Sequence, residues 1–238
     1  IGDQIIKIDS IKTKGMKIPE VAKLIKGELD TEVVLHVRRP STKQKIEFPL
    51  TRSNIQINDV PYWGVDKSNI AYVRVNRFSK NTGKDFRKAL LELGKLDIDG
   101  LVIDLRSNSG GLLSNAISML DRIIDRGLPL LETKGRLKRS NKTFSSRAKP
   151  IIDPSVPIAV LINKSSASAS EIFAGVLQDY DRGVIIGRKS FGKGLVQSMF
   201  NLNDTTTLKI TTAKYYTPSG RLIQKQDYMK DGFFTDGL

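Results

Sequence analysis

The most constraining feature of this sequence is a pair of short apolar runs that each lead into a polar turn and then into a helical pattern. Residues 100–105 (GLVIDL) and 157–162 (PIAVLI) are almost continuously apolar, which is typical of strands buried on both faces of a sheet. Helical spacing follows these runs at residues 112–124 and 168–177. Strands that alternate with helices in this way predict an α/β fold.

Further strands and a helix are predicted around these two runs. Residues 51–69 are interpreted as a connecting stretch that contains Trp63. The remaining segments with strand or helix patterns are strands at 70–75, 183–187, 195–202 and 208–216, and a helix at 86–93. Residues 51–238 are therefore expected to form one large α/β domain.

The first 50 residues are predicted to form a separate, smaller module. A strand at 4–9 is followed by a helix at 19–27, which has Pro19 at its start and Gly27 at its end. Two further strands, at 33–37 and 46–50, surround a polar hairpin.

The chain contains no cysteine and a single histidine, His36. The lack of cysteine excludes disulfides, thiolate catalysis and cysteine-ligated zinc. One imidazole cannot build a site with several histidines, and a Ser-His-Asp triad would have to use His36, which lies in a predicted strand and is expected to be structural. We therefore predict no metal and no other cofactor.

The formal net charge of +14 invites a nucleic-acid interpretation. The excess is, however, spread along the chain, and its densest stretch, residues 134–149, is interpreted as a solvated loop with few aromatic residues. We therefore do not expect nucleic-acid binding, because acidic substrates or an anionic envelope surface would account for the charge equally well. No apolar run approaches the roughly 18 residues that a membrane span requires.

Three junctions between a strand and a turn carry the candidate chemistry, and the first is residues 104–111. Here a buried strand runs into a polar turn that ends in Gly110 and Gly111. Paired glycines let backbone N–H groups face a ligand without an intervening side chain, as an oxyanion hole or an anion-binding nest requires. An ordinary glycine turn between a strand and a helix is the alternative.

The second junction, residues 163–171, joins another apolar strand to a helix through alternating small residues. A nucleophilic serine needs an uncrowded turn, and the helix N-terminus behind it stabilises developing negative charge. The alternative is simple helix capping, in which Ser168 or Ser170 acts together with Glu171.

The third junction, residues 187–194, almost matches a phosphate-binding loop, but Gly194 stands where a hydroxyl should bind magnesium and a strand follows instead of a helix. Lys193 lies between two glycines and close to apolar residues. Loss of water would lower the pKa of such a lysine from its reference value of about 10.4. A neutral amine can deprotonate a serine hydroxyl, and Ser-Lys is a known substitute for Ser-His.

These junctions resemble, in the same order, the motifs of the carboxyl-terminal processing proteases, also called tail-specific proteases. The matching segments are DLRSNSGG (104–111), SASASEI (166–172), SFGKG (190–194) and TAKYYTPSGR (212–221). The resemblance covers nearly the whole chain and implies a serine peptidase with a Ser-Lys dyad and a crotonase-like α/β protease core.

The resemblance also assigns roles to individual residues. It implies that Ser168 is the nucleophile, that Lys193 is the general base and that Gln197 positions the lysine amine. Asp179 is similar to an aspartate that supports the site, although it equally fits a surface carboxylate at the end of a helix. The oxyanion hole would consist of the N–H groups of Ala169 and Gly111, with Gly110 as the near alternative, and Ser166 and Ser170 would be structural.

The first 50 residues resemble the latter part of a PDZ domain. By this resemblance, Val21, Leu24 and Ile25 lie on the helix that borders the peptide groove, although core packing would also explain them. The start at Ile1 is neither an initiator methionine nor a signal peptide and is typical of the interior of a longer chain. The strand and loop that grip a terminal carboxylate are missing before residue 2, so the chain as given is expected to bind substrate tails poorly.

The implied domains are thus a partial PDZ domain at residues 1–50 and a serine protease core at 51–238. The implied function is endopeptidase cleavage of proteins with accessible C-terminal tails through an acyl-enzyme. The alternative is a catalytically inactive scaffold or peptide-binding protein with the same fold. The resemblance further implies a location in the periplasm or cell envelope, and a homo-oligomer or a regulatory envelope partner.

Overall fold

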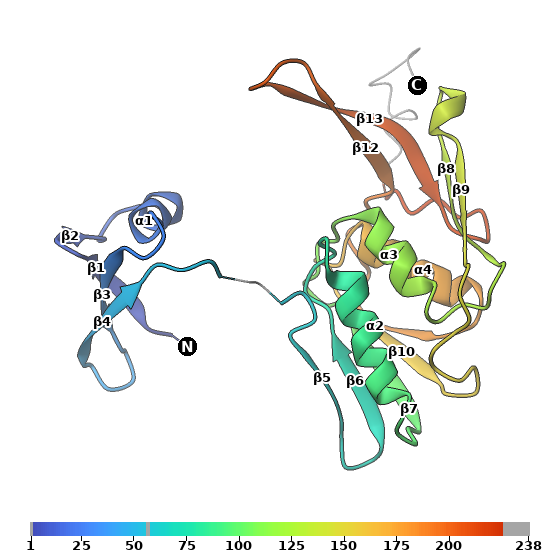
Figure 1. Cartoon of the computed structure of the whole chain (residues 1–238), viewed down its shortest axis with the longest axis horizontal. Helices are drawn as coiled ribbons and strands as arrows, with labels where there is room; N and C mark the ends of the chain where they lie inside the picture. Colours follow the sequence, from blue (N-terminus) through green and yellow to red (C-terminus); the bar gives the residue numbers. More distant parts are fainter. Residues whose placement is uncertain (1, 56–57, 226–238) are drawn as a thin grey trace. The chain divides into compact units, whose positions relative to one another are not determined.

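The computed structural model describes residues 2–55 and 58–225. The chain divides into two compact units, Ile1–Ile57 and Asn58–Leu238 (Figure 1). Each unit has its own sheet or sheets.

The N-terminal unit contains one four-stranded sheet in the order β2-β1-β3-β4. Its elements are β1 (Gln4–Ile8), β2 (Ile11–Lys12), α1 (Ile18–Ile25), β3 (Glu32–Arg38) and β4 (Lys45–Thr51). Helix α1 begins where Pro19 fits the first turn and where the Glu20 carboxylate accepts a hydrogen bond from the Lys17 N–H at 2.8 Å. The side chains of Ile8, Val33 and Val37 are the buried apolar residues of the sheet.

The larger unit is built on a five-stranded sheet in the order β11-β10-β7-β6-β5. Its strands are β5 (Tyr62–Val65), β6 (Ile70–Arg74), β7 (Gly100–Asp104), β10 (Ile158–Ile162) and β11 (Val184–Gly187). Strand β5 is antiparallel to β6, and the other four strands are parallel to one another. The buried apolar runs of the sequence are thus the central strands β7 and β10, as their composition predicts.

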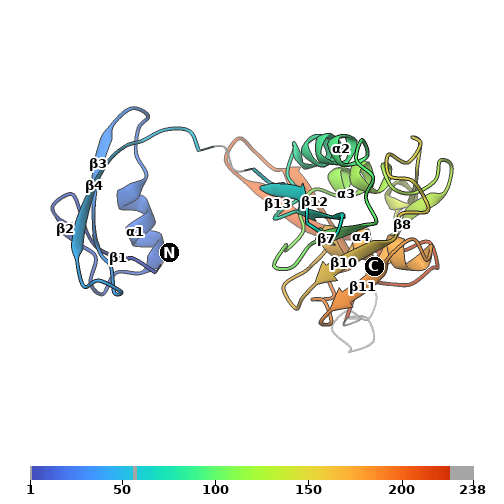
Figure 2. The same cartoon turned by 90° about the horizontal axis from the view of Figure 1, so that it is seen from below.

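Three helices, α2 (Thr82–Leu93), α3 (Leu113–Leu120) and α4 (Ala169–Asp179), connect these strands. Helix α3 packs between α2 and α4 (Figures 1 and 2). Phe86 of α2 and Phe173 of α4 meet edge to face at 6.1 Å between ring centroids, and both are fully buried. The apolar faces of all three helices belong to one core cluster with the central strands.

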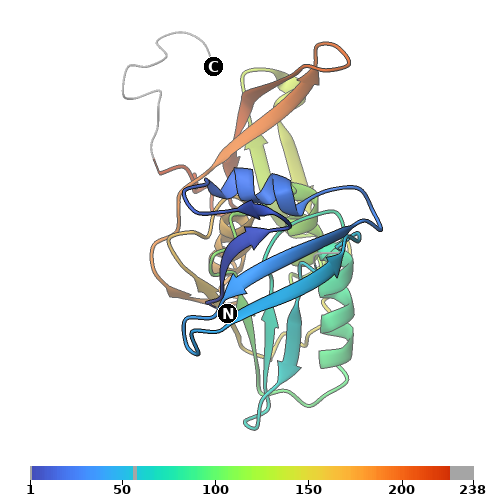
Figure 3. The same ribbon diagram turned by 90° about the vertical axis from the view of Figure 1, so that its left-hand side faces the viewer.

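A second sheet in this unit has the order β12-β13-β8-β9. It consists of β8 (Pro129–Lys134), β9 (Lys142–Ser145), β12 (Leu195–Asn201) and β13 (Thr207–Tyr216), with a short 3-10 helix, η1 (Lys138–Ser140), between β8 and β9. The hairpins β12–β13 and β8–β9 extend in the same direction from the helices (Figures 1 and 3).

Strand β8 was not predicted, although Leu130 and Leu131 are fully buried, and two further segments differ from the sequence-based expectation. The basic stretch 134–149 is not a continuous loop, because Lys142–Ser145 pairs with β8 as strand β9. The stretch 51–69 contains strand β5, in which Trp63 lies opposite Val73. Both strands lie at sheet edges and are largely exposed, so they lack the apolar pattern that marks a buried strand. Among the described residues, no helix is long and apolar enough to cross a membrane.

Candidate active site

The three candidate junctions lie at one edge of the five-stranded sheet. Strands β7, β10 and β11 are parallel neighbours, with Asp104 paired with Leu161 and Gly187 paired with Ile162 at their carboxyl ends. The turns that follow these strands therefore emerge side by side, which is where α/β sheets hold their ligands. The Phe191 N–H donates to the Ser166 carbonyl at 3.0 Å and joins the third turn to the second.

Ser168 occupies a strained turn immediately before α4. Its backbone has φ 55° and ψ −113°, a conformation that L-residues adopt at a cost of roughly 1–3 kcal/mol and that is concentrated at functional sites. The Ser168 hydroxyl makes no capping hydrogen bond to α4, and the residue is half-buried. The geometry is that of a nucleophile elbow, in which a sharp turn between strand and helix presents a hydroxyl.

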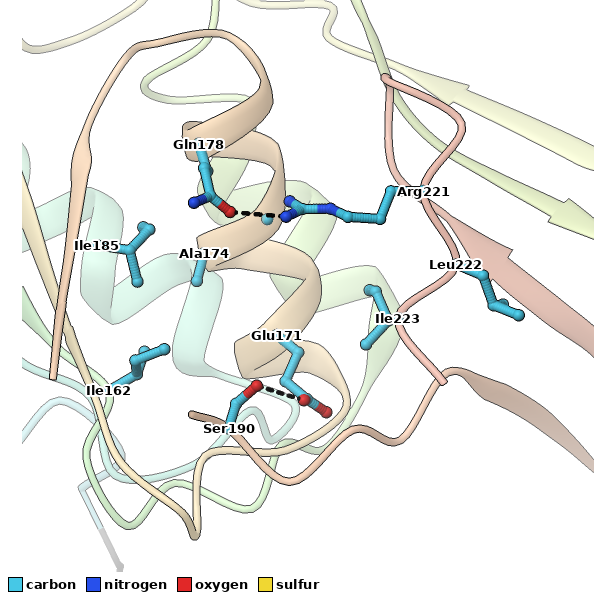
Figure 4. A pocket seen from close by; sticks show the side chains of 10 residues that line it. Ile162, Glu171, Ala174, Gln178, Ile185, Ser190, Arg221, Leu222 and Ile223 are labelled. Atoms are coloured by element: carbon cyan, nitrogen blue, oxygen red, sulfur yellow. Dashed lines mark hydrogen bonds between the residues drawn. The ribbon is translucent and has the colours of Figure 1, made fainter. Parts of the chain in front are cut away.

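Glu171 holds this turn against the loop that carries Lys193. Its buried carboxylate accepts hydrogen bonds through Oε2 from the backbone N–H groups of Ser168 (2.7 Å) and Lys193 (2.8 Å). Through Oε1 it accepts from the Ser190 hydroxyl (2.7 Å) and the Gly192 N–H (2.6 Å), the first of which is drawn in Figure 4. Two backbone nitrogens, one from each candidate catalytic residue, therefore lie within 2.8 Å of the same oxygen atom.

Gly110 and Gly111 lie directly beside the serine turn. Gly110 has φ +95°, and a Cβ on it would lie 2.9 Å from the Ser168 Cβ and 3.0 Å from the Ala169 nitrogen. The Gly110 N–H is already engaged, because it donates to the Asn108 Oδ1 at 2.9 Å. Gly111 forms a parallel bridge with Phe78, so its own N–H points away from that residue. Within residues 58–225, neither the Gly111 N–H nor the Ala169 N–H has a hydrogen-bond acceptor.

Asn108 connects the glycine turn to the serine turn. Its side-chain amide donates to the Val75 carbonyl at 2.9 Å, and its own carbonyl accepts from the Ala167 N–H and the Ser170 hydroxyl. Ser166, equally buried, donates to the Leu105 carbonyl at 2.8 Å. Ser166 and Ser170 thus hold the backbone of the two turns together and are not free to act as nucleophiles.

The side chains of Ser168, Lys193 and Gln197 are not joined to one another in this structure. Lys193 is half-buried, and among the described residues its amine makes no hydrogen bond or ion pair. Gln197 lies four residues further on, exposed in β12, at an irregularity of the β12–β13 ladder where Thr211 is its partner. Such irregularities change the direction of side chains next to active sites.

Asp179 lies at the last residue of α4, at the opposite end of the helix from Ser168. Helical rise separates the two by roughly 16 Å. The Asp179 carboxylate accepts hydrogen bonds from the Ser219 N–H (3.0 Å) and from Arg221 (2.8 Å). Burial opposes its ionisation, but hydrogen bonds from Thr217 and Ser219 outweigh this and lower its pKa.

The segment that Asp179 holds continues to the loop around Lys193. The Gly194 N–H donates to the Gln224 Oε1 at 2.8 Å, and the Lys225 N–H donates to the Gly192 carbonyl at 3.0 Å. A Cβ on either glycine would come within 2.5 Å of this segment. Asp179 is therefore connected to the Lys193 loop through residues 217–225.

A cavity of about 180 Å³ lies along α4 between the Glu171 contact and Arg221 (Figure 4). Ile162, Ala174, Ile185 and Ile223 make its walls apolar. Arg221 at its far end is engaged by the Gln178 side chain at 2.8 Å as well as by Asp179.

An ionic cluster around the buried Asp104 carboxylate underlies the glycine turn. Asp104 is fully buried and accepts hydrogen bonds from Arg74 (2.6 Å), Arg106 (2.7 Å) and the Tyr72 hydroxyl (2.7 Å). Burial raises the pKa of Asp104, but the hydrogen bonds from Arg106, Tyr72 and Arg74 outweigh burial and hold the pKa well below its ordinary value. Because Arg74 also donates to the Arg106 carbonyl at 2.8 Å, the cluster fixes the start of the turn that ends in Gly110 and Gly111.

Sequence reasoning missed the roles of Glu171 and Asn108. The signal for Glu171 was present, because serine followed by glutamate three residues later is the capping-box pattern. That pattern predicts only the contact within α4 and not the three contacts to residues 190–193. Asn108 stands within the matching motif at 104–111, but nothing in the sequence indicated the hydrogen bonds that it forms.

The remaining predicted binding residues lie in the N-terminal unit. Val21, Leu24 and Ile25 share one face of α1 and are half-buried, while Ile18 on the same helix is 85% exposed. His36 lies in β3 with its Nδ1 2.9 Å from Glu47. In the described part of the chain, no three His, Asp or Glu side chains gather as metal ligands would.

A strained serine turn beside two unengaged backbone amides, at the carboxyl edge of a parallel sheet, is typical of α/β serine hydrolases. The model of peptidase family S41 matches residues 69–232, and the chain belongs to this family of serine peptidases. The C-terminal processing peptidase of the Tetradesmus obliquus chloroplast is 36% identical over 94% of this chain and 50% of that protein. The carboxyl-terminal-processing protease of a Picosynechococcus strain is 38% identical over 96% of this chain and 55% of that protein. The chain thus spans about half the length of these relatives.

Solved structures share the fold. The photosystem II D1 C-terminal processing protease superimposes with a TM-score of 0.64 and 32% identity, over 94% of this chain and 61% of that chain. Mature CPAF superimposes with a TM-score of 0.55 over 94% of this chain and 70% of that chain. At 15% identity, the second likeness concerns the fold alone.

Proposed function

We infer that this chain carries the catalytic core of a serine endopeptidase that cleaves proteins near their C-termini, with Ser168 as nucleophile and Lys193 as general base. The observation that carries the inference is the Glu171 carboxylate, which binds the N–H groups of both residues. Names of the relatives support the substrate class, since the two proteins above are both C-terminal processing enzymes.

The proposed reaction is acyl transfer. The neutral Lys193 amine takes the proton of the Ser168 hydroxyl as its oxygen attacks the scissile carbonyl. The unengaged N–H groups of Ala169 and Gly111 stabilise the resulting oxyanion, whereas the Gly110 N–H is excluded by its bond to Asn108. Collapse breaks the C–N bond, and the leaving amine takes the proton from the Lys193 ammonium. Water then attacks the acyl-enzyme with the same amine as base and releases the acid and free Ser168.

Two further residues have supporting roles in the proposal. Gln197 orients the Lys193 amine once that side chain reaches Ser168, as its nearby place on β12 allows. Asp179 acts at a distance, through the segment that contacts Gly192 and Gly194. The N-terminal unit is proposed to act as part of a PDZ domain that presents substrate tails along Val21, Leu24 and Ile25. A location in the periplasm or cell envelope, and a homo-oligomer or an envelope partner, belong to the same proposal.

Substitution of the dyad tests the catalytic assignment. Ser168→Ala should lower kcat/KM for an unfolded protein substrate by at least about a thousandfold. Lys193→Ala should lower kcat by roughly 10²–10⁴-fold with little change in KM, because the base acts in the chemical step. Initial rates of cleavage, followed by mass spectrometry of the products, measure both effects.

Lys193→Arg is the matched control for charge. Arginine keeps the cation but does not lose its proton in proteins, so this variant should stay as inactive as Lys193→Ala. Cleavage that survives Ser168→Ala would contradict the assignment. A fluorophosphonate probe that fails to label Ser168 in the full protein would instead favour a catalytically inactive scaffold or peptide-binding protein.

A further inference from the structure

A second cleft opens on the face of the β12-β13-β8-β9 sheet that is turned toward α3. It has a volume of about 620 Å³, within the range of ligand-binding clefts. Apolar side chains line it from both hairpins and from α3: Leu113, Phe144, Val196, Phe200 and Ile210. Phe200 and Ile210 remain 42% and 43% exposed, so this apolar surface is open to a ligand.

Three cations border the same cleft. Arg136, Arg139 and Lys142 belong to the segment that leads from β8 through η1 into β9, and all three line the cleft. None of them forms an ion pair within residues 2–55 and 58–225, and no Asp or Glu lines the cleft. The basic segment therefore adds positive charge to the apolar cleft, and this charge is not neutralised by the residues that line it.

Some residues that line the cleft lie close in sequence to the proposed catalytic groups. Leu113 follows Gly111 by two residues, and Val196 follows Lys193 by three. From Val196 to Phe200, strand β12 rises about 13 Å, which matches about four residues of an extended peptide. We propose that this cleft binds an extended, apolar stretch of the substrate peptide that bears a carboxylate, which Arg136, Arg139 and Lys142 recognise. The proposal rests on the proposed peptidase function and names its substrate class.

The lining favours a peptide over a nucleic acid. Single strands bind to basic grooves that offer several aromatic rings on which successive bases stack. Among the described residues, Phe144 and Phe200 are the only aromatic ones that line the cleft, and aliphatic side chains provide the rest of its apolar surface. Aliphatic surface is suited to peptide side chains, while guanidinium groups bind carboxylates with good geometry.

Peptide binding to the full chain with Ser168→Ala tests the proposal without cleavage. Four octapeptides of Ala, Val and Leu, each with a neutral fluorophore at the N-terminus, contain either one Glu or one Gln and end in a free or an amidated C-terminus. Fluorescence anisotropy should give the weakest binding for the Gln peptide with an amidated end. Comparison of the two carboxylate sources then shows whether a side chain or the chain end is recognised.

The variant R136Q/R139Q/K142Q should weaken binding of the carboxylate peptides about tenfold and change binding of the neutral peptide less than about twofold. K84Q/R87Q/K88Q removes the same charge from exposed positions of α2 and should leave all four affinities unchanged. Equal affinity for the four peptides, or equal losses in both triple variants, would overturn the proposal. So would a single-stranded oligonucleotide that displaces the peptides and depends on the same three cations. Lack of cleavage by the unaltered chain would count against the proposed function alone, since this assay needs no catalysis.

Discussion

At the scale of single residues, the Glu171 carboxylate binds the Ser168 N–H at the start of α4, while the N–H groups of Ser170 and Glu171 donate to the backbone carbonyls of Ala167 and Ser168. A capping hydroxyl would be tied to the helix amides, whereas here the Ser168 N–H is bound by Glu171 and the hydroxyl stays clear of the helix. The two interpretations of this junction, helix cap and nucleophile, are therefore compatible. The same carboxylate binds the backbone N–H groups of Ser168 and Lys193.

Glu171→Gln should lower kcat by roughly a hundredfold, because displacement of about 1 Å between reacting groups has an effect of that size. An amide offers one acceptor oxygen and would set its NH₂ group against N–H donors, so the free energy of unfolding should also fall by about 1–3 kcal/mol. Steady-state kinetics and urea unfolding measure the two effects. Glu92→Gln, at an exposed Glu92–Lys95 pair, is the control and should change neither quantity appreciably. Full activity of Glu171→Gln would show that this carboxylate does not position the dyad.

Asp104→Asn should lower the free energy of unfolding at pH 7 by about 2–3 kcal/mol, because Arg74 and Arg106 lose the charge that they share. The Asp104 pKa is held below its ordinary value of 3.8. Its stabilising effect is thus complete above that value and is lost as the pH falls. The difference in the free energy of unfolding between the unaltered chain and Asp104→Asn should consequently become smaller below about pH 4.

Urea unfolding from pH 7 down to pH 3 measures that narrowing. Asp97→Asn serves as the control, since Asp97 is exposed and forms no ion pair with the described residues. A stability difference that stays constant across this pH range would show that Asp104 acts through packing and not through its charge.

At the scale of elements, the sequence predicts the parts of the fold that depend on apolar pattern. The sequence predicted strands β7 and β10 and the helices that follow them. Buried strands show continuous apolar runs, and helices with one buried face show apolar residues at helical spacing. Strand β9 was not predicted, because Lys142–Ser145 is mostly exposed and owes its pairing to β8, which is distant in sequence. The contacts that join the three turns also depend on sheet order, which no local pattern records.

The glycine turn between β7 and α3 depends on the close contact of Gly110 with the serine turn. Gly110→Ala would place a Cβ 2.6 Å from the Ala167 carbonyl oxygen and 2.9 Å from the Ser168 Cβ, at φ +95°. We expect activity to fall by at least about a hundredfold, because the serine turn must move. Gly127→Ala is a matched control, since Gly127 has φ +92° and nothing within 4 Å of the added Cβ. It should lose about 1 kcal/mol of stability from backbone strain and keep its activity. Equal kinetic effects of the two substitutions would contradict a specific role for the Gly110 contact.

At the scale of the whole molecule, the two compact units differ in how much apolar surface they bury. In the larger unit, one continuous core extends from Val60 to Tyr215 and includes all three helices. In the N-terminal unit, the buried apolar side chains are Ile8, Val33 and Val37, and no residue of α1 is fully buried. Small cores give low stability, so the two units are expected to differ in their resistance to unfolding.

The single tryptophan makes this difference measurable. Trp63 lies in β5 of the larger unit, opposite the fully buried Val73, whereas far-ultraviolet circular dichroism reports strands and helices of both units. In urea, part of the dichroism signal should therefore be lost at a lower concentration than the Trp63 fluorescence change. A chain of residues 58–238 should retain the Trp63 midpoint of the full chain and lose the early dichroism change. Coincident transitions of the two signals in the full chain would contradict the expected difference in stability between the two units.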